Sequence, residues 1–364
     1  MQQTYEIKRG LCTLAARKRI PVSGAFELTP RCNLNCSMCY VRMTPEEMAP
    51  IGRERTTEEW LEMGRTARDA GLVFLLLTGG EPMLRPDFPR LYRDLTNMGL
   101  SVSINSNGCL IDDEIRKLFL ELPPALINIT LYGTSAESYG RLCGVSSAFD
   151  RVVENIRWLK ENGITVNLNA TVTPWNAEDL DGIYAFAKEH GISMRPTLYN
   201  FPPTRRTNKD EFRRLPAEEV GKLLAKDMLI QHGIAGVKKM VASFGTPDAV
   251  NPGCGLELGE HLECFAGRSQ FWISWDGSMV ACGMLSQPVV KPFEVGFQAA
   301  WEELVEKTAA ITLCPDCTGC QHKEICTKCA AVTSAETGRF DGKPEYMCAV
   351  TEKYCAEMRR IAEQ

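Results

Sequence analysis

The sequence lacks the features that would place it in a membrane or on nucleic acid. It has no run of 18 apolar residues, so we expect no membrane-spanning helix. Acidic residues outnumber basic ones by 46 to 41, and the net charge of -5 gives no basic footprint for nucleic acid. The first 21 residues are mixed and polar, without the apolar stretch of a secretory signal. We therefore expect a cytoplasmic protein.

Histidine is also scarce, whereas cysteine is abundant. The four histidines form no ligand pair, which argues against a histidine-based metal site. The sixteen cysteines are clustered, with three between residues 32 and 39 and ten from residue 254 onward. Since no export signal is present, such clusters indicate metal binding rather than disulfides.

The first cluster contains Cys32, Cys36 and Cys39 in a C-x3-C-x2-C spacing. Three thiolates this close in sequence can hold three irons of a [4Fe–4S] cube and leave the fourth iron open to a small molecule. The next cysteine is Cys109, so no fourth ligand lies nearby. A zinc knuckle or unrelated free thiols are the alternatives.

Residues 24–200 alternate between strand-like and helix-like patterns, which predicts an α/β fold with a parallel sheet and right-handed crossovers. The six strand–helix units are too few for a closed eight-unit barrel. We predict strands at 24–29, 73–78, 101–105, 125–131, 165–173 and 193–199, and helices at 56–70, 91–98, 112–121, 149–162, 177–190 and 217–226.

Three motifs follow the first three predicted strands. The cysteines follow the first strand, a Gly-Gly-Glu-Pro run the second, and a Ser-Asn-Gly run the third. Ligand sites gather at the carboxyl ends of parallel strands, so we expect these motifs to lie together. Read singly, the second and third motifs are also ordinary turn sequences.

This combination resembles the radical S-adenosylmethionine (SAM) family, whose fold is a partial (β/α)6 barrel. The resemblance implies that Cys32, Cys36 and Cys39 hold a [4Fe–4S] cluster and that SAM chelates its open iron. One electron then splits SAM into methionine and a 5′-deoxyadenosyl radical, which abstracts hydrogen from an unactivated C–H bond. It also implies an electron donor such as flavodoxin or ferredoxin.

The resemblance further assigns SAM contacts. Core packing, turn formation and an exposed loop arginine are the alternative interpretations. The implied SAM-binding residues are Tyr40, Gly79, Gly80, Glu81, Pro82, Ser106, Asn107, Arg141, Asn169 and Val172.

The cysteine-rich tail resembles the SPASM extension, which carries auxiliary iron–sulfur clusters. Twelve residues separate Cys264 from Gly277 and four separate Gly277 from Cys282, as that pattern requires. The resemblance implies two auxiliary [4Fe–4S] clusters, and hence three clusters in all. The first would be held by Cys254, Cys264, Cys282 and Cys329, and the second by Cys317, Cys320, Cys326 and Cys348.

The tail departs from the pattern at one point. Only two residues separate Cys326 from Cys329, where the pattern has three, and Cys314 could take the place of Cys329. Structural zinc sites are the alternative for the tail.

We predict a β-hairpin turning at Asp276-Gly277. The expected domains are an N-terminal extension at 1–23, the partial barrel at 24–230 and the auxiliary-cluster domain at 231–364.

The resemblance implies an oxidoreductase that modifies a ribosomally synthesised peptide, by oxidative crosslinking. Sulfatase maturation is disfavoured because Gly283 stands where those enzymes have an Asp. Some 23 residues precede the predicted barrel, too few for a peptide-recognition domain, so leader binding would need a separate protein or the barrel mouth. The alternatives are dehydrogenation of a small metabolite such as an amino-sugar, and a non-catalytic electron carrier.

Overall fold

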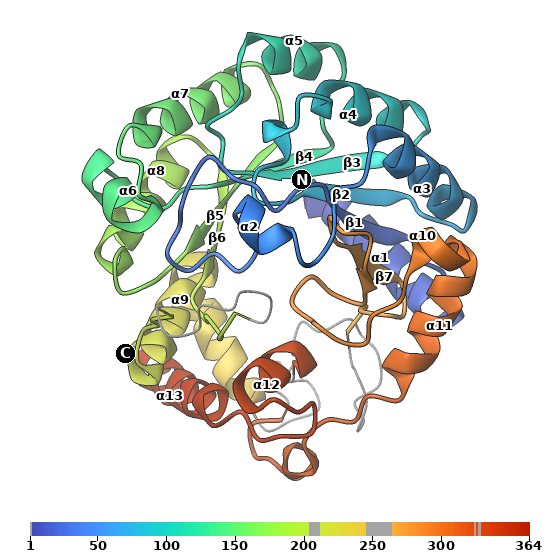
Figure 1. Ribbon diagram of the computed structural model, residues 1–364. Helices are drawn as coiled ribbons and strands as arrows, with labels where there is room; N and C mark the ends of the chain where they lie inside the picture. The colour runs from blue at the N-terminus through green and yellow to red at the C-terminus, as the bar shows by residue number, and fades with distance from the viewer. Residues whose placement is uncertain (1, 204–211, 245–263, 324, 327–328) are drawn as a thin grey trace. The chain divides into compact units, whose positions relative to one another are not determined.

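The computed structural model describes residues 2–203, 212–244, 264–323, 325–326 and 329–364 (Figure 1). It divides into two compact units. The first contains the chain up to Thr197, a short segment at Pro203–Phe212, and Phe265–Thr308. The second contains Leu198–Pro202, Arg213–Cys264 and Ala309–Gln364.

The first unit is built on an eight-stranded sheet in the order β6-β5-β4-β3-β2-β1-β7-β8. Every neighbouring pair is parallel except β7 and β8, which are antiparallel. The sheet is not closed, because β6 and β8 are edges. The strands are β1 (Ser23–Glu27), β2 (Phe74–Thr78), β3 (Ser101–Ser106), β4 (Leu126–Thr130), β5 (Val166–Thr171), β6 (Ser193–Thr197), β7 (Gln270–Ile273) and β8 (Met279–Val280).

Helices follow the strands in series, so the predicted α/β fold with a partial barrel is confirmed. Thr56 begins one of them with a capping box: its side chain accepts from the Glu59 N–H, and the Glu59 side chain accepts from the Thr56 N–H. The helices are α1 (Gln2–Lys18), α2 (Pro45–Met48), α3 (Thr57–Asp69), η1 (Pro82–Leu84), α4 (Phe88–Asn97), α5 (Asp113–Glu121), α6 (Ala136–Cys143), α7 (Ala148–Glu161), η2 (Ala177–Asp179), α8 (Leu180–Glu189), α10 (Pro292–Val295) and α11 (Phe297–Ala309).

The two faces of this sheet differ in polarity. Figure 1 shows α3, α4, α5, α7 and α8 around the outside of the strands. The side chains on one face of the sheet are apolar. Ile104, Ile127 and Leu168 on this face are completely buried. The alternate residues on the other face, among them Asn105 and Asn128, are polar and half-buried. Burial of the apolar face fixes the register, and the period of two then fixes which side chains face inward.

The sheet also recruits a segment that we expected in the second domain. β7 pairs in parallel with β1, with Gly24 opposite Phe271. A Cβ atom at Gly24 would lie 2.3 Å from the Phe271 ring, so the glycine makes room for the aromatic side chain. The predicted hairpin is present as β7 and β8. Residues 265–308 therefore group with the barrel unit, although they fall within the range 231–364 expected for the auxiliary-cluster domain.

The second unit is helical over most of its described length. It contains α9 (Ala217–Ser243), η3 (Pro315–Cys317), α12 (Ala330–Thr337) and α13 (Glu345–Ala362). The core between α9 and α13 contains Ala225, Val237, Met358 and Ile361. The predicted end of α9 at residue 226 is wrong, because burial of Val237 in this core extends the helical segment past a break at Gly233 (φ 66°, ψ 177°). Within the described residues, no helix is both long and apolar enough to span a bilayer.

Candidate functional site

The three cysteines of the first cluster lie on the loop that follows β1. Backbone hydrogen bonds anchor this loop, since the N–H groups of Asn35 and Ser37 donate to the carbonyls of Cys143 and Leu142. Two of the sulfur atoms accept backbone N–H groups. Leu34 N–H donates to Cys32 Sγ at 3.4 Å, and Arg42 N–H donates to Cys39 Sγ at 3.3 Å.

This donor set fits an iron–sulfur cluster. Burial raises the pKa of the Cys32 thiol to about 12, so the thiol stays protonated at neutral pH until a metal displaces the proton. N–H groups that point at the sulfurs would stabilise the thiolates that form. No three His, Cys, Asp or Glu side chains of the described segments converge on a single ion. A cube holds its thiolates at separate corners, so such convergence is not required.

The Gly-Gly-Glu-Pro run packs directly against the cysteine loop. Gly80 N–H donates to the Thr29 carbonyl at 2.7 Å, and Glu81 N–H donates to the Arg31 carbonyl at 2.9 Å. A Cβ atom at Gly79 or Gly80 would lie 2.4 Å from those same carbonyl oxygens. The glycines therefore allow two loops of the protein to approach each other, in addition to any contact with a ligand.

Glu81 joins this loop to the end of β3. Its side chain is fully buried and accepts from Ser106 Oγ at 3.0 Å, Asn107 N–H at 2.8 Å and Met83 N–H at 3.1 Å. Burial raises the pKa of this carboxyl group to about 7. Donors of the protein itself thus already contact the Glu81 carboxylate that was predicted to accept from SAM.

Asn107 completes the connection to the sulfur atoms. Its Nδ2 donates to Asn33 Oδ1 at 2.8 Å and lies 3.6 Å from Cys32 Sγ. The motifs after β1, β2 and β3 therefore meet in one hydrogen-bonded site, as expected for the carboxyl ends of parallel strands. Sequence reasoning missed Asn33, whose only signal was its place beside Cys32. It also missed Cys143 and Tyr132, whose hydrogen bonds lower the pKa of the Cys36 thiol.

The other predicted SAM contacts are more dispersed. Tyr40 is half-buried on the cysteine loop, and Asn169 is half-buried on β5 beside Arg195 of β6. Val172 is 1% exposed, just after β5. Arg141 on α6 forms an ion pair with Glu178, which engages the guanidinium that was predicted to meet the SAM carboxylate.

In the second unit, six cysteines line one cavity of about 60 Å³. They include all four residues predicted for the second auxiliary cluster. They also include Cys329, which was assigned to the first cluster, and Cys314, its proposed substitute. The six are Cys314, Cys317, Cys320, Cys326, Cys329 and Cys348.

Of the described cysteines predicted for the first auxiliary cluster, only Cys329 lines this cavity. Cys254 lies outside the described residues. Cys264 is exposed and belongs to the second unit, whereas Cys282 belongs to the first unit, just after β8. Burial raises the pKa of the Cys317 thiol in the cavity to about 12, which again leaves a protonated thiol that a metal would have to ionise.

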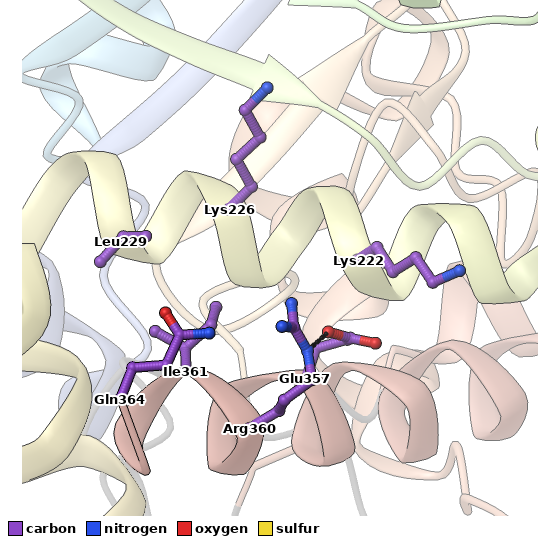
Figure 2. A pocket seen from close by; sticks show the side chains of 7 residues that line it. All are labelled: Lys222, Lys226, Leu229, Glu357, Arg360, Ile361 and Gln364. Atoms are coloured by element: carbon purple, nitrogen blue, oxygen red, sulfur yellow. Dashed lines mark hydrogen bonds and ion pairs between the residues drawn. The ribbon is translucent and has the colours of Figure 1, made fainter.

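A second cavity, of about 480 Å³, lies between α9 and α13, towards the far end of α13 from Cys348 (Figure 2). Glu357 and Arg360 form an ion pair at its edge, with 2.7 Å between Oε2 and Nε. No thiol lines it. The lining residues are Lys222, Lys226, Leu229, Glu357, Arg360, Ile361 and Gln364.

Comparison with known proteins gives a family match and several relatives. Residues 26–187 match the model of the Radical SAM superfamily. An AdoMet-dependent heme synthase of Methanosarcina barkeri is 27% identical over 329 residues, which cover 87% of this chain and 93% of the relative. A PqqA peptide cyclase of Granulibacter bethesdensis is 29% identical over 173 residues, which cover 48% of this chain and 46% of the relative.

Two solved structures show the same fold over most of the chain. Streptococcus suis SuiB bound to the precursor peptide SuiA has a TM-score of 0.67 at 18% identity, covering 91% of this chain and 77% of SuiB. The enzyme anSMEcpe with bound AdoMet has a TM-score of 0.68 at 16% identity, covering 94% of this chain and 95% of that protein.

Proposed function

We propose that residues 26–187, which match the Radical SAM superfamily model, form a radical SAM domain, and that the protein cleaves SAM at a cluster on Cys32, Cys36 and Cys39 to oxidise a peptide. The observation that carries the proposal is the joining of three strand-end loops around those thiols through Glu81 and Asn107. When bound, the cluster and SAM supply the 5′-deoxyadenosyl radical that abstracts a hydrogen atom.

The protein's own residues would position these groups. Asn107 holds its amide beside Cys32 Sγ, and the buried Glu81 fixes Asn107 through its backbone N–H. Gly79 and Gly80 keep their loop in contact with the cysteine loop, so that backbone groups of both loops can reach one ligand. The SAM contacts that we propose remain Tyr40, Gly79, Gly80, Glu81, Pro82, Ser106, Asn107, Arg141, Asn169 and Val172.

We propose that the cavity with six thiols holds an auxiliary cluster. Oxidative crosslinking removes one hydrogen atom, one electron and one proton from the substrate, and an acceptor must take the electron. A cluster on Cys317, Cys320, Cys326 and Cys348 would provide that acceptor, and their convergence on one cavity supports the assignment. Cys254, Cys264, Cys282 and Cys329 remain the proposed ligands of a further cluster.

The peptide assignment is supported by relatives whose substrates are peptides. The PqqA peptide cyclase is similar to about half of this chain, and SuiB shares the fold in a complex with its precursor peptide. The proposed reaction is oxidative modification, by crosslinking, of a ribosomally synthesised peptide. A separate leader-binding protein and a flavodoxin or ferredoxin would be its protein partners.

A specific observation favours a second candidate. The heme synthase of Methanosarcina barkeri aligns with 87% of this chain, a much larger share than the peptide cyclase. The small-metabolite alternative therefore takes a definite form, which is radical modification of a tetrapyrrole.

One anaerobic experiment tests both candidate functions, oxidation of a peptide and modification of a tetrapyrrole. The reconstituted full chain is incubated with SAM, dithionite and either peptides encoded beside its gene or an iron porphyrin, and 5′-deoxyadenosine and substrate mass are measured. We expect 5′-deoxyadenosine together with a peptide that has lost two mass units. A change in the porphyrin alone would establish the second candidate, and absence of 5′-deoxyadenosine under every condition would refute the radical chemistry.

A further inference from the structure

A row of three asparagines crosses the polar face of the sheet. Asn105 of β3 lies opposite Asn128 of β4, and Asn128 lies opposite Asn167 of β5. All three are half-buried and face away from the apolar side that packs against the helices. We call Asn105, Asn128 and Asn167 the asparagine row.

Hydrogen bonding within the row is incomplete. Asn128 Nδ2 donates to Asn105 Oδ1 at 2.8 Å. Asn167 Oδ1 is buried, yet it accepts no hydrogen bond from any residue that the structure describes. A buried amide oxygen in that state is costly unless a ligand or water satisfies it. Asn167 therefore has an acceptor available for a molecule that enters the barrel.

The position of the row relates it to the candidate site. The next inward-facing residues towards the carboxyl ends of the strands are Thr130, Asn169 and Arg195, which are paired in register. Asn169 is one of the proposed SAM contacts. The asparagine row thus lies one layer deeper in the barrel than the level at which SAM is expected, where a substrate would face the radical.

The chemistry of the row selects among substrates. Each amide offers both an N–H donor and a C=O acceptor, which is the complement of a peptide group. The row carries no positive charge, and Glu27 lies buried at the end of β1 in the same sheet. A ligand rich in carboxylates would find Arg195 as the one cation beside the row, because Asn105, Asn128, Asn167, Thr130 and Asn169 are neutral.

We propose that the asparagine row is a substrate subsite for a peptide amide, with Asn167 Oδ1 accepting an N–H of the substrate. Asn128 and Asn105 act as positioning residues, since the hydrogen bond between them fixes the middle of the row. This inference rests on the proposed peptide function and specifies the part of the barrel that recognises the peptide.

The test compares two substitutions at one position. The reconstituted full chain with SAM bound is titrated calorimetrically with acetyl-trialanine amide, a neutral peptide probe. Asn167→Leu removes the acceptor and should raise the Kd of the probe about tenfold, the value of one hydrogen bond. Asn167→Asp keeps an acceptor at the same place and should stay within about threefold of the wild type.

The matched control is Asn97→Leu, the same substitution at an exposed position on α4. Iron content and the cluster spectrum show that each variant is folded and loaded. Equal affinity in Asn167→Leu and wild type, equal losses in Leu and Asp, or tighter binding of coproporphyrin than of the peptide probe would each overturn the inference. Failure of the proposed function is distinguishable, because it would appear in the wild type as absence of 5′-deoxyadenosine or as a change in the porphyrin alone.

Discussion

The loop at Cys32–Cys39 and the tail cavity both gather thiols, but in different ways. The loop offers three sulfurs, and backbone or amide N–H groups of the first unit approach two of them. The cavity brings together six sulfurs in the second unit. A cube takes four ligands, so the loop leaves one iron open and the cavity has more thiols than one cube needs. Under the proposed function, the loop would hold the cluster that cleaves SAM and the cavity would hold a cluster that accepts the electron from the substrate.

The largest expected effect divides the two regions functionally. The triple variant Cys32→Ala, Cys36→Ala, Cys39→Ala should lose SAM cleavage entirely but retain iron in the tail, since the cavity thiols are untouched. Iron analysis and a 5′-deoxyadenosine assay measure this. Cys12→Ala is the control, a buried thiol on α1 that belongs to neither set. Loss of all iron in the triple variant would contradict the proposal that the tail binds iron independently of Cys32, Cys36 and Cys39.

Replacing Cys317, Cys320, Cys326 and Cys348 with Ser should give the opposite result. We expect this variant to lose the iron of one cluster and its spectroscopic signal, whereas cleavage of SAM continues without product formation. Cys355→Ser on α13 is the control, because that buried thiol does not line the cavity. Single replacements of Cys314 and Cys329 sharpen the assignment, since only a true ligand should perturb the signal. An unchanged iron content in the quadruple variant would contradict the cavity assignment.

Glu81 gives the loop region a pH-dependent contribution to stability between about pH 4 and pH 7. Its raised pKa means that the folded state prefers the protonated carboxyl group. This contribution to stability is fully present below the unfolded pKa of about 4.3 and is lost as pH rises through about 7, on the order of 3 kcal/mol in total. Denaturant unfolding of wild type and Glu81→Gln from pH 4 to 8 should show this difference. If the free energies of unfolding of the two proteins changed in parallel with pH, the proposed contribution of Glu81 would be contradicted.

Gly80→Ala tests whether the contact between the two loops requires glycine. The added Cβ would lie 2.4 Å from the Arg31 carbonyl oxygen, so the backbone must shift, at a cost of about 2 kcal/mol. The control is Gly10→Ala on α1, where a Cβ meets nothing within 4 Å and helix propensity should improve. Thermal unfolding measures both. Equal stability of Gly80→Ala and the wild type would show that the loops need not be this close.

Arg141→Ala should have the smallest effect. The Arg141 side chain is 41% exposed and is paired with the exposed Glu178, so the free energy of unfolding should change little. Contact with the SAM carboxylate would require exchange of that partner, so we expect the Kd for SAM to rise about threefold. Equilibrium binding of SAM checks this. A Kd identical to that of the wild type would remove Arg141 from the site.

Local patterns accounted for much of the first unit. Strand and helix positions followed from hydrophobic period and caps, and Thr56 begins α3 as predicted because its partner Glu59 is only three residues away. Similarly, the motifs after β1, β2 and β3 could be placed together because parallel strands present their carboxyl ends at one edge. The helices α1, α2, α6 and α10 to α13 were not predicted.

Contacts between distant residues escaped prediction. The buried carboxylate of Glu81 looked like a ligand group in sequence, but its partners Ser106 and Asn107 follow a different strand. The pairing of β7 with β1 depends on Phe271 filling the space above Gly24, some 250 residues earlier. Asn105 and Asn128 are hydrogen-bonded to each other, but no local pattern indicates this contact, because register alone aligns the three asparagines of the row.

The sequence by itself determined which cysteines are candidates to bind iron and which strand ends carry the motifs, because cysteine spacing and hydrophobic period are properties of short stretches of chain. The tertiary structure alone decided what each side chain meets: that Glu81 accepts from the β3 loop, that Cys314 and Cys329 join one cavity, and that three asparagines align across the sheet. These contacts depend on strand register and on the burial of distant residues against one another, which no local sequence pattern encodes.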